Sequence, residues 1–104
     1  MQFNVELSEL AEQQYDEILS YIANELKNPQ ALKNVMDDFD NTITKLERRA
    51  DSFGYCNSNR LKEMGLHKIR FARHRYLFVY RVNKSQVIIE GMYHELQDYE
   101  NAII

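Results

Sequence analysis

The hydrophobic pattern of this 104-residue chain changes its period once, near residue 49, and that change constrains the fold more than any single motif. Up to residue 49, apolar residues recur every three or four positions, whereas beyond about residue 66 they alternate with polar ones. The first pattern is typical of amphipathic helices, and the second is typical of strands with one buried face. The sequence therefore predicts an α+β domain with its helices before most of its strands.

Two helices are predicted in the first half, after a short strand in which Phe3, Val5 and Leu7 alternate with polar residues. Ser8 is a natural N-cap for the first helix, and the Asn28-Pro29 pair ends this helix and begins the second. The first apolar stripe comprises Ala11, Tyr15, Ile18, Ile22 and Leu26, and the second comprises Leu32, Val35, Met36, Phe39, Ile43 and Leu46. Because the connection is short, we expect an antiparallel helical hairpin.

Three strands are predicted after a loop at residues 50–59, and they cover residues 66–73, 76–82 and 87–93. The short connections, His74-Arg75 and residues 83–85, make them an antiparallel meander. The expected order is β-α-α-β-β-β within a single domain of residues 1–104. We expect the helical hairpin to cover one face of the sheet and to leave the other face free.

The basic residues are concentrated on the predicted sheet, although the protein as a whole is acidic, with a formal net charge of -3. Between positions 60 and 81 the only acid is Glu63, and the bases are Arg60, Lys62, Lys68, Arg70, Arg73, Arg75 and Arg81. Strand alternation places Lys68, Arg70 and Arg81 on the face that the helices leave free. Such a face either keeps the sheet soluble or binds phosphate groups or an acidic partner.

Other features argue against a membrane protein, a disulfide protein or a metalloprotein. No stretch approaches the length of a membrane span, and the first residues do not resemble a signal peptide, so we expect a cytoplasmic location. The single cysteine, Cys56, is interpreted as an ordinary thiol. The spacing of His67, His74 and His94 matches no standard zinc pattern, so neither a metal nor another cofactor is predicted.

An ordered set of motifs along nearly the whole chain resembles the RelE/ParE superfamily of toxins from type II toxin–antitoxin systems, also called plasmid stabilisation proteins. The motifs are VELSELAEQQYDEILSYIANEL, Asn28-Pro29 between the helices, GLHKIRF followed by RYLFVYRV, and the closing HELQDYENAII. The resemblance implies a small toxin with two helices on an antiparallel sheet, neutralised by a cognate antitoxin. Some members of the superfamily cleave mRNA at the ribosome, and others poison DNA gyrase.

For the ribonuclease branch, the resemblance also implies site residues. Cleavage of RNA by its own 2′-hydroxyl needs a proton acceptor, cations at the phosphate and a donor to the leaving oxygen, and it needs no metal. Lys68 and Arg70 match the basic positions of that site, and His94 and Tyr99 match its C-terminal acid–base or base-stacking positions. The basic cluster itself supplies the candidates for binding a substrate or partner, which are Arg73, Arg75 and Arg81.

The chain departs from the ribonuclease pattern at several positions. Leu77 follows Tyr76 where those enzymes carry an arginine, Leu96 and Gln97 replace arginines of the C-terminal motif, and Glu95 adds an acid. Three functions therefore stay open: a ribosome-dependent mRNA interferase, a non-enzymatic gyrase inhibitor of the ParE type, and a degenerate module that only binds an antitoxin.

Overall fold

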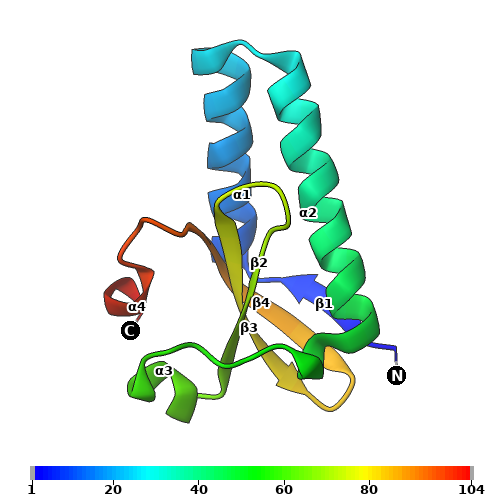
Figure 1. Ribbon diagram of the computed structural model, residues 1–104, viewed down its shortest axis with the longest axis vertical. Helices are drawn as coiled ribbons and strands as arrows, with labels where there is room; N and C mark the ends of the chain where they lie inside the picture. The colour runs from blue at the N-terminus through cyan, green and yellow to red at the C-terminus, as the bar shows by residue number, and fades with distance from the viewer. Residues whose placement is uncertain (1, 104) are drawn as a thin grey trace.

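The computed structural model describes residues 2–103 and has a helical hairpin packed on a four-stranded sheet (Figure 1). The predicted β-α-α-β-β-β order is confirmed. Its elements are β1 (Asn4–Leu7), α1 (Glu9–Tyr21), α2 (Pro29–Arg49), β2 (Leu66–Arg70), β3 (Tyr76–Asn83) and β4 (Gln86–His94). A π-helical turn, η1 (Ile22–Leu26), prolongs α1, and a 3-10 turn, η2 (Ala50–Ser52), follows α2. Two short helices, α3 (Asn59–Glu63) and α4 (Tyr99–Ala102), were not predicted from the sequence.

Both predicted helix caps are confirmed. The Ser8 hydroxyl accepts a hydrogen bond from the backbone N–H of Ala11 at 3.0 Å, and the Asn28 side-chain oxygen accepts one from Ala31 at 3.1 Å. Pro29 occupies the first turn of α2, where the missing N–H costs no helical hydrogen bond. These local choices fix where each helix begins, and the short turn between them makes the hairpin antiparallel (Figure 1).

The sheet has the strand order β1-β4-β3-β2. The antiparallel meander of β2, β3 and β4 is confirmed, and β1 lies parallel to β4, so the complete sheet is mixed. A register shift between Val79 and Tyr80 leaves Glu90 as an extra residue of β4. β2 lies at the edge of the sheet, and its outer side is paired with residues 54–56 through the isolated antiparallel bridge between Tyr55 and His67.

The main core lies between the helices and one face of the sheet. Tyr15 of α1 stacks on Phe39 of α2 with ring centroids 3.8 Å apart, and Phe39 meets Phe78 of β3 edge to face at 5.4 Å. Tyr76 and Tyr80 lie on this face, as the strand pattern predicts. Leu26 and Met36 belong to the predicted stripes but are exposed. The part of the hairpin near its tip extends beyond the sheet (Figure 1), whereas Met36 lies next to the buried Val35 and is on the solvent side of α2.

The expectation that the second face of the sheet is free is wrong. Leu66, Leu77, Val79 and Tyr93 point to that face and are buried, because α3, the loop before it and the C-terminal residues cover them. The covering residues are Cys56, Leu61, Met64, Tyr99 and Ile103. Apolar residues on this side of β3 and β4 needed a second layer, and two segments without strong periodicity provide it.

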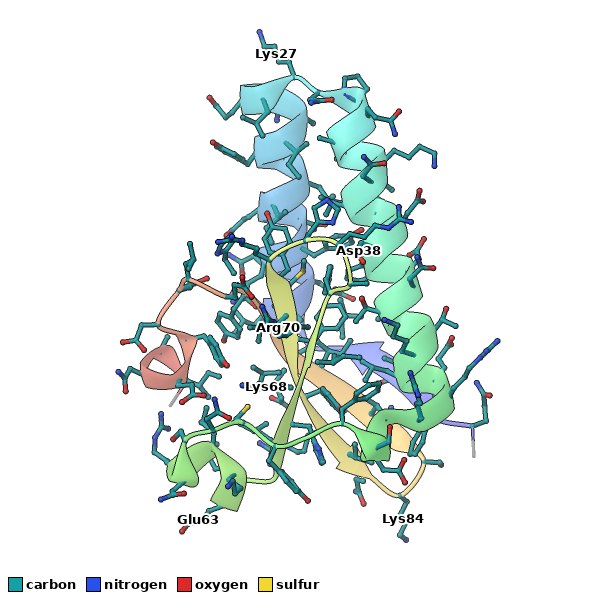
Figure 2. All side chains as sticks on the ribbon, viewed as in Figure 1. Lys27, Asp38, Glu63, Lys68, Arg70 and Lys84 are labelled. Atoms are coloured by element: carbon teal, nitrogen blue, oxygen red, sulfur yellow. The ribbon has the colours of Figure 1, made fainter. Side chains whose placement is uncertain are left out.

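A buried carboxylate joins the helices to the β2–β3 turn. Asp38 of α2 has a side chain only 1% exposed, and it accepts hydrogen bonds from the backbone N–H groups of Ala72 and Arg73 at 3.2 and 3.0 Å. Its oxygen also lies 2.7 Å from Nδ1 of His74. In Figure 2, Asp38 lies beside this turn, well away from the tip of the helical hairpin at Lys27. The turn that carries Arg73 and Arg75 is therefore fastened to the helix layer.

We expect Asp38→Ala to lower the free energy of unfolding by about 2–3 kcal/mol, because it leaves two backbone N–H groups and His74 without their acceptor. Chemical denaturation followed by circular dichroism would measure the loss. The matched control is Asp37→Ala, which removes an exposed pair with Lys33 and should cost about 0.5 kcal/mol or less. Equal losses in the two variants would contradict a specific role for Asp38.

The same carboxylate predicts a dependence of stability on pH. Burial raises the pKa of Asp38, but the hydrogen bond from His74, the N–H of Arg73 and the charge of His74 outweigh burial and hold it below 3.8. Because the pKa of Asp38 is lower in the folded state than in the unfolded state, the ionised carboxylate stabilises the fold above the unfolded pKa of 3.8. This contribution is lost as the pH falls through the lowered pKa of the folded state. The stability difference between wild type and Asp38→Asn should therefore be smaller at pH ~3 than at pH ~5. A difference that grows in acid would reverse the expected sign.

Candidate functional site

A shallow hollow of about 250 Å³ lies where β2, β3 and the C-terminal segment meet, on the face opposite the helical hairpin. Its lining residues are Lys68, Arg70, Leu77, Glu95, Leu96 and Tyr99. Lys68 and Arg70 share this face because they are two residues apart on one strand, as Figure 2 shows along β2. The structure thus brings three of the four predicted catalytic residues, Lys68, Arg70 and Tyr99, to one place.

The C-terminal segment reaches this hollow by a turn after β4. The N–H of Gln97 donates to the carbonyl of His94 at 2.9 Å, and Tyr99 then stacks on Tyr93 with ring centroids 5.6 Å apart. Tyr93 can lie close to the sheet because Gly91 is beneath it, where a Cβ atom would stand 2.5 Å from the ring. A glycine on β4 therefore makes room for the ring on which Tyr99 rests.

Arg70, Arg73 and Arg75 form an exposed basic surface, and the carboxylate of Glu95 neutralises part of it. The carboxylate of Glu95 pairs with Arg70 through one oxygen and approaches Nε of Arg75 at 3.6 Å through the other. The Glu95 side chain is 21% exposed, whereas each arginine side chain is 67% exposed. Glu95 therefore partly neutralises two of the predicted site arginines. Lys68 forms no ion pair among residues 2–103.

Tyr99 is a proton donor in this environment. Its side chain is largely buried, and burial, together with the negative charge of Glu100, raises the pKa of Tyr99 above its ordinary 10.0. The phenol therefore stays protonated near neutral pH and can donate a hydrogen bond, but it cannot serve as a base. Cys56 lies in the same buried cluster, where burial raises the pKa of its thiol.

His94 does not line the hollow. It pairs with Tyr76 across β4 and β3, and the two rings meet edge to face at 5.5 Å on the side of the sheet that faces the helices. Its Nδ1 accepts a hydrogen bond from the N–H of Leu96 at 3.1 Å. The structure therefore does not bring His94 together with Lys68 and Arg70, because the chain turns between His94 and Tyr99.

The three predicted binding arginines lie in two separate places. Arg73 and Arg75 are exposed on the β2–β3 turn that Asp38 fastens. Arg81 lies at the opposite end of β3, where it donates to the carbonyl of Met64 at 2.5 Å and approaches Glu90 at 3.6 Å. Arg81 is thus committed to holding the segment after α3, and it does not extend the surface formed by Arg70 and Arg75.

Two residues important to the site were not predicted as site residues. Glu95 was noticed only as an added acid, and its place between two arginines depends on the turn after β4. Asp38 gave no signal beyond being an acid near the apolar stripe of α2, since its partners are more than 30 residues away in the sequence. Contacts of this range are invisible to strand and helix periodicity.

The hollow is suited to binding an anion and poorly equipped for acid–base catalysis. It offers one ammonium, one guanidinium and a protonated phenol, beside the exposed Leu96. A proton acceptor for an RNA 2′-hydroxyl would have to be Glu95, which the two arginines hold. The arrangement therefore provides recognition groups for a phosphate or carboxylate, without a free base.

Residues 2–103 contain no group of three His, Cys, Asp or Glu side chains arranged to hold a metal ion. Within the same residues, no helix combines the length and apolar character needed to cross a membrane.

Comparison with known proteins supports the fold alone. No protein-family model matches the sequence, and no curated protein matches it. The structure is similar to a solved one described as the chromosomal ParDE TA system from P. aeruginosa, with a TM-score of 0.72 and 15% sequence identity. The similarity covers 89% of this chain and 96% of the other. The chain has a RelE/ParE-like fold.

Proposed function

We propose that this protein is the toxin of a type II toxin–antitoxin system. The observation that carries the proposal is the similarity along 89% of the chain to a structure described as a ParDE TA system. The motifs that resemble RelE/ParE toxins support the same function, because they fall on the elements of this fold in the expected order. We place the protein in the cytoplasm, where the ribosome and DNA gyrase are found.

The proposed partner is an acidic, flexible antitoxin segment that covers the basic surface. Arg70, Arg73 and Arg75 are exposed, and Leu96 beside the hollow is 76% exposed. A segment that alternates acidic and apolar side chains would satisfy both kinds of contact and would order itself on binding. Shielding of this surface would neutralise the toxin whichever cellular target it has.

For the target, the geometry favours a binding mechanism over a catalytic one. His94 lies on the other face of the sheet, and Glu95 partly neutralises Arg70 and Arg75. A gyrase inhibitor of the ParE type needs a complementary surface and no catalytic base. We therefore propose gyrase inhibition as the first mechanism.

Cleavage of mRNA at the ribosome, the first of the functions expected from the sequence, is the second candidate. One observation favours it: Lys68, Arg70 and Tyr99 line the same hollow, as a phosphate clamp with a phenol donor would require. In this mechanism Glu95 would take the proton of the attacking 2′-hydroxyl, and the two cations would stabilise the phosphorane. Tyr99 would give a proton to the leaving oxygen. Substitution of Lys68 and Arg70 together would then abolish mRNA cleavage.

Expression of this chain alone should stop growth, and co-expression of a small neighbouring gene should restore it. The measurement is colony formation after induction, with the amount of protein checked by blotting. Normal growth at good expression would contradict the toxin proposal and would favour a module that only binds an antitoxin.

The order in which synthesis stops should separate the two targets. After a short pulse of induction, labelled precursors report new protein and new DNA in parallel. Gyrase inhibition predicts that DNA synthesis falls first and that a DNA-damage response appears while translation continues. An early arrest of translation with cleaved mRNA would instead support the ribosomal target.

Removal of the negative charge of Glu95 should strengthen binding of the antitoxin. We expect Glu95→Gln to bind it about three- to tenfold more tightly at low salt, because Arg70 and Arg75 lose their carboxylate partner, and the gain should shrink at high salt. Calorimetric titration would measure it. Glu90→Gln is the matched control, because it makes the same charge change in a pair with Arg81 at the other end of β3. Weaker binding by Glu95→Gln alone would contradict the role given to Glu95.

A further inference from the structure

A second hollow, of about 280 Å³, lies between α1 and the helix-facing side of β3 and β4, and we propose that it binds an alkylammonium group. Such a group occurs in a free polyamine and at the end of a lysine side chain. This α1 hollow and the hollow lined by Lys68, Arg70 and Tyr99 have different lining residues. The site does not depend on the proposed toxin function.

One wall of the α1 hollow is a single face of the helix. Gln14, Glu17, Ile18 and Tyr21 line it, and their spacing along the sequence places them on the same side of α1. Glu17 and Tyr21 are one helical turn apart, so the carboxylate and the phenol ring are neighbours on the helix surface.

The opposite wall comes from the sheet and from the turn after β4. Tyr76 and Met92 are diagonal neighbours on one face of the sheet in the register of β3 and β4. The N–H of Met92 donates to the side-chain oxygen of Gln14 at 2.8 Å, which ties α1 to β4 at this place. Gln97 completes the lining, and its side-chain oxygen accepts a hydrogen bond from the N–H of His94 at 3.3 Å. Figure 1 shows the chain after β4 passing beside α1 before it reaches α4.

Two phenol groups from different elements border this hollow. Burial raises the pKa of Tyr76 above its ordinary 10.0, and the nearby phenol of Tyr21 raises it further. Tyr76 is therefore uncharged near neutral pH. Because the face of an aromatic ring attracts a cation, two rings beside a carboxylate are the kind of group that recognises an organic ammonium ion.

The charge of the lining also selects a cation. Of the described residues that line the hollow, Glu17 alone is charged. In the part of the chain that the structure describes, Glu17 forms no ion pair, and its carboxylate accepts a hydrogen bond from the neutral side chain of Gln13 at 3.1 Å. An ammonium group would supply the missing positive charge, whereas a phosphate or carboxylate ligand would be repelled.

The apolar lining favours an organic cation over a metal ion. Ile18 and Met92 offer surface that the methylene groups of an alkyl chain can cover. A metal ion would gain nothing from this surface, and it would need more oxygen ligands than one carboxylate. The volume lies just below the usual range for small-molecule sites, so it suits one ammonium group with a short alkyl chain.

A row of acids continues from this hollow along α1. A wider adjoining hollow shares Glu17 and Tyr21 with it, and the other acids that line this wider hollow are Glu9, Glu12, Asp16 and Glu25. Acids in the first turn stabilise a helix through its dipole, but that effect does not reach the later turns. The sequence of α1 contains no Lys or Arg to balance them. Since successive ammonium groups of a linear polyamine lie about one helical turn apart, such a ligand could extend from the rings along these acids.

Amide chemical shifts measured by NMR during titration test the proposal on the full chain. The probes are butylammonium, its neutral counterpart butanol, the polyamine spermidine and an oligolysine peptide. We expect butylammonium to shift the backbone amides of Tyr21 and Met92. It should bind at least about fivefold more tightly than butanol, because only the ammonium group interacts with the carboxylate and the rings.

Two pairs of variants separate the site from general charge effects. Glu17→Gln should weaken butylammonium binding at least about fivefold, whereas the matched control Glu63→Gln should change it by less than about twofold. Glu63 is exposed, lines neither hollow and lies at the end of the molecule opposite the hairpin tip at Lys27 (Figure 2). Tyr21→Leu should weaken binding about threefold, and Tyr21→Phe, which keeps the ring, by less than about twofold. Circular dichroism checks that each variant is folded.

The last two probes identify the source of the ammonium group. Tighter binding of spermidine than of oligolysine supports a free polyamine as the ligand, and tighter binding of oligolysine supports a lysine side chain of a protein. Three results would overturn the proposal: no shift at Tyr21 and Met92 with any ammonium probe, equal affinity for butanol and butylammonium, or equal weakening by Glu17→Gln and Glu63→Gln.

Discussion

The buried carboxylate of Asp38 is the contact on which the placement of the basic surface depends. It accepts hydrogen bonds from two successive backbone N–H groups of the β2–β3 turn and contacts His74. A carboxylate this deeply buried is tolerated only because its oxygens accept hydrogen bonds, and those bonds require the β2–β3 turn to stay in one position. The helical hairpin and the β2–β3 hairpin therefore behave as one unit, although they are far apart in the sequence.

The same logic explains why a cluster of seven bases does not behave as one surface. Arg81 is used at the far end of β3, between Glu90 and the carbonyl of Met64. Arg70 and Arg75 share Glu95, which arrives with the C-terminal segment. The positive charge that keeps no acidic partner is therefore smaller than the count of bases along the sequence indicates. Local neutralisation decides which cations are available to bind a ligand.

Much of the fold could be predicted from the sequence, because its elements follow from local rules. The caps at Ser8 and Asn28 and the alternation along β3 depend on neighbours within a few residues, and all are confirmed. The second apolar layer could not be predicted, since Leu61 and Tyr99 belong to helices of five and four residues, which have too few turns to show a period. Leu77 and Val79 were the sequence signal for this layer, because a strand face exposed to solvent does not usually carry consecutive apolar residues.

The site was predictable only in part, for a related reason. Lys68 and Arg70 were placed on the correct face by strand alternation, and Tyr99 was placed beside them by the resemblance. The position of His94 apart from these residues could not be predicted, because its direction depends on where β4 ends and how the chain turns after it. A residue within a regular strand inherits its direction from the pattern, whereas a residue at a strand end takes it from the tertiary structure.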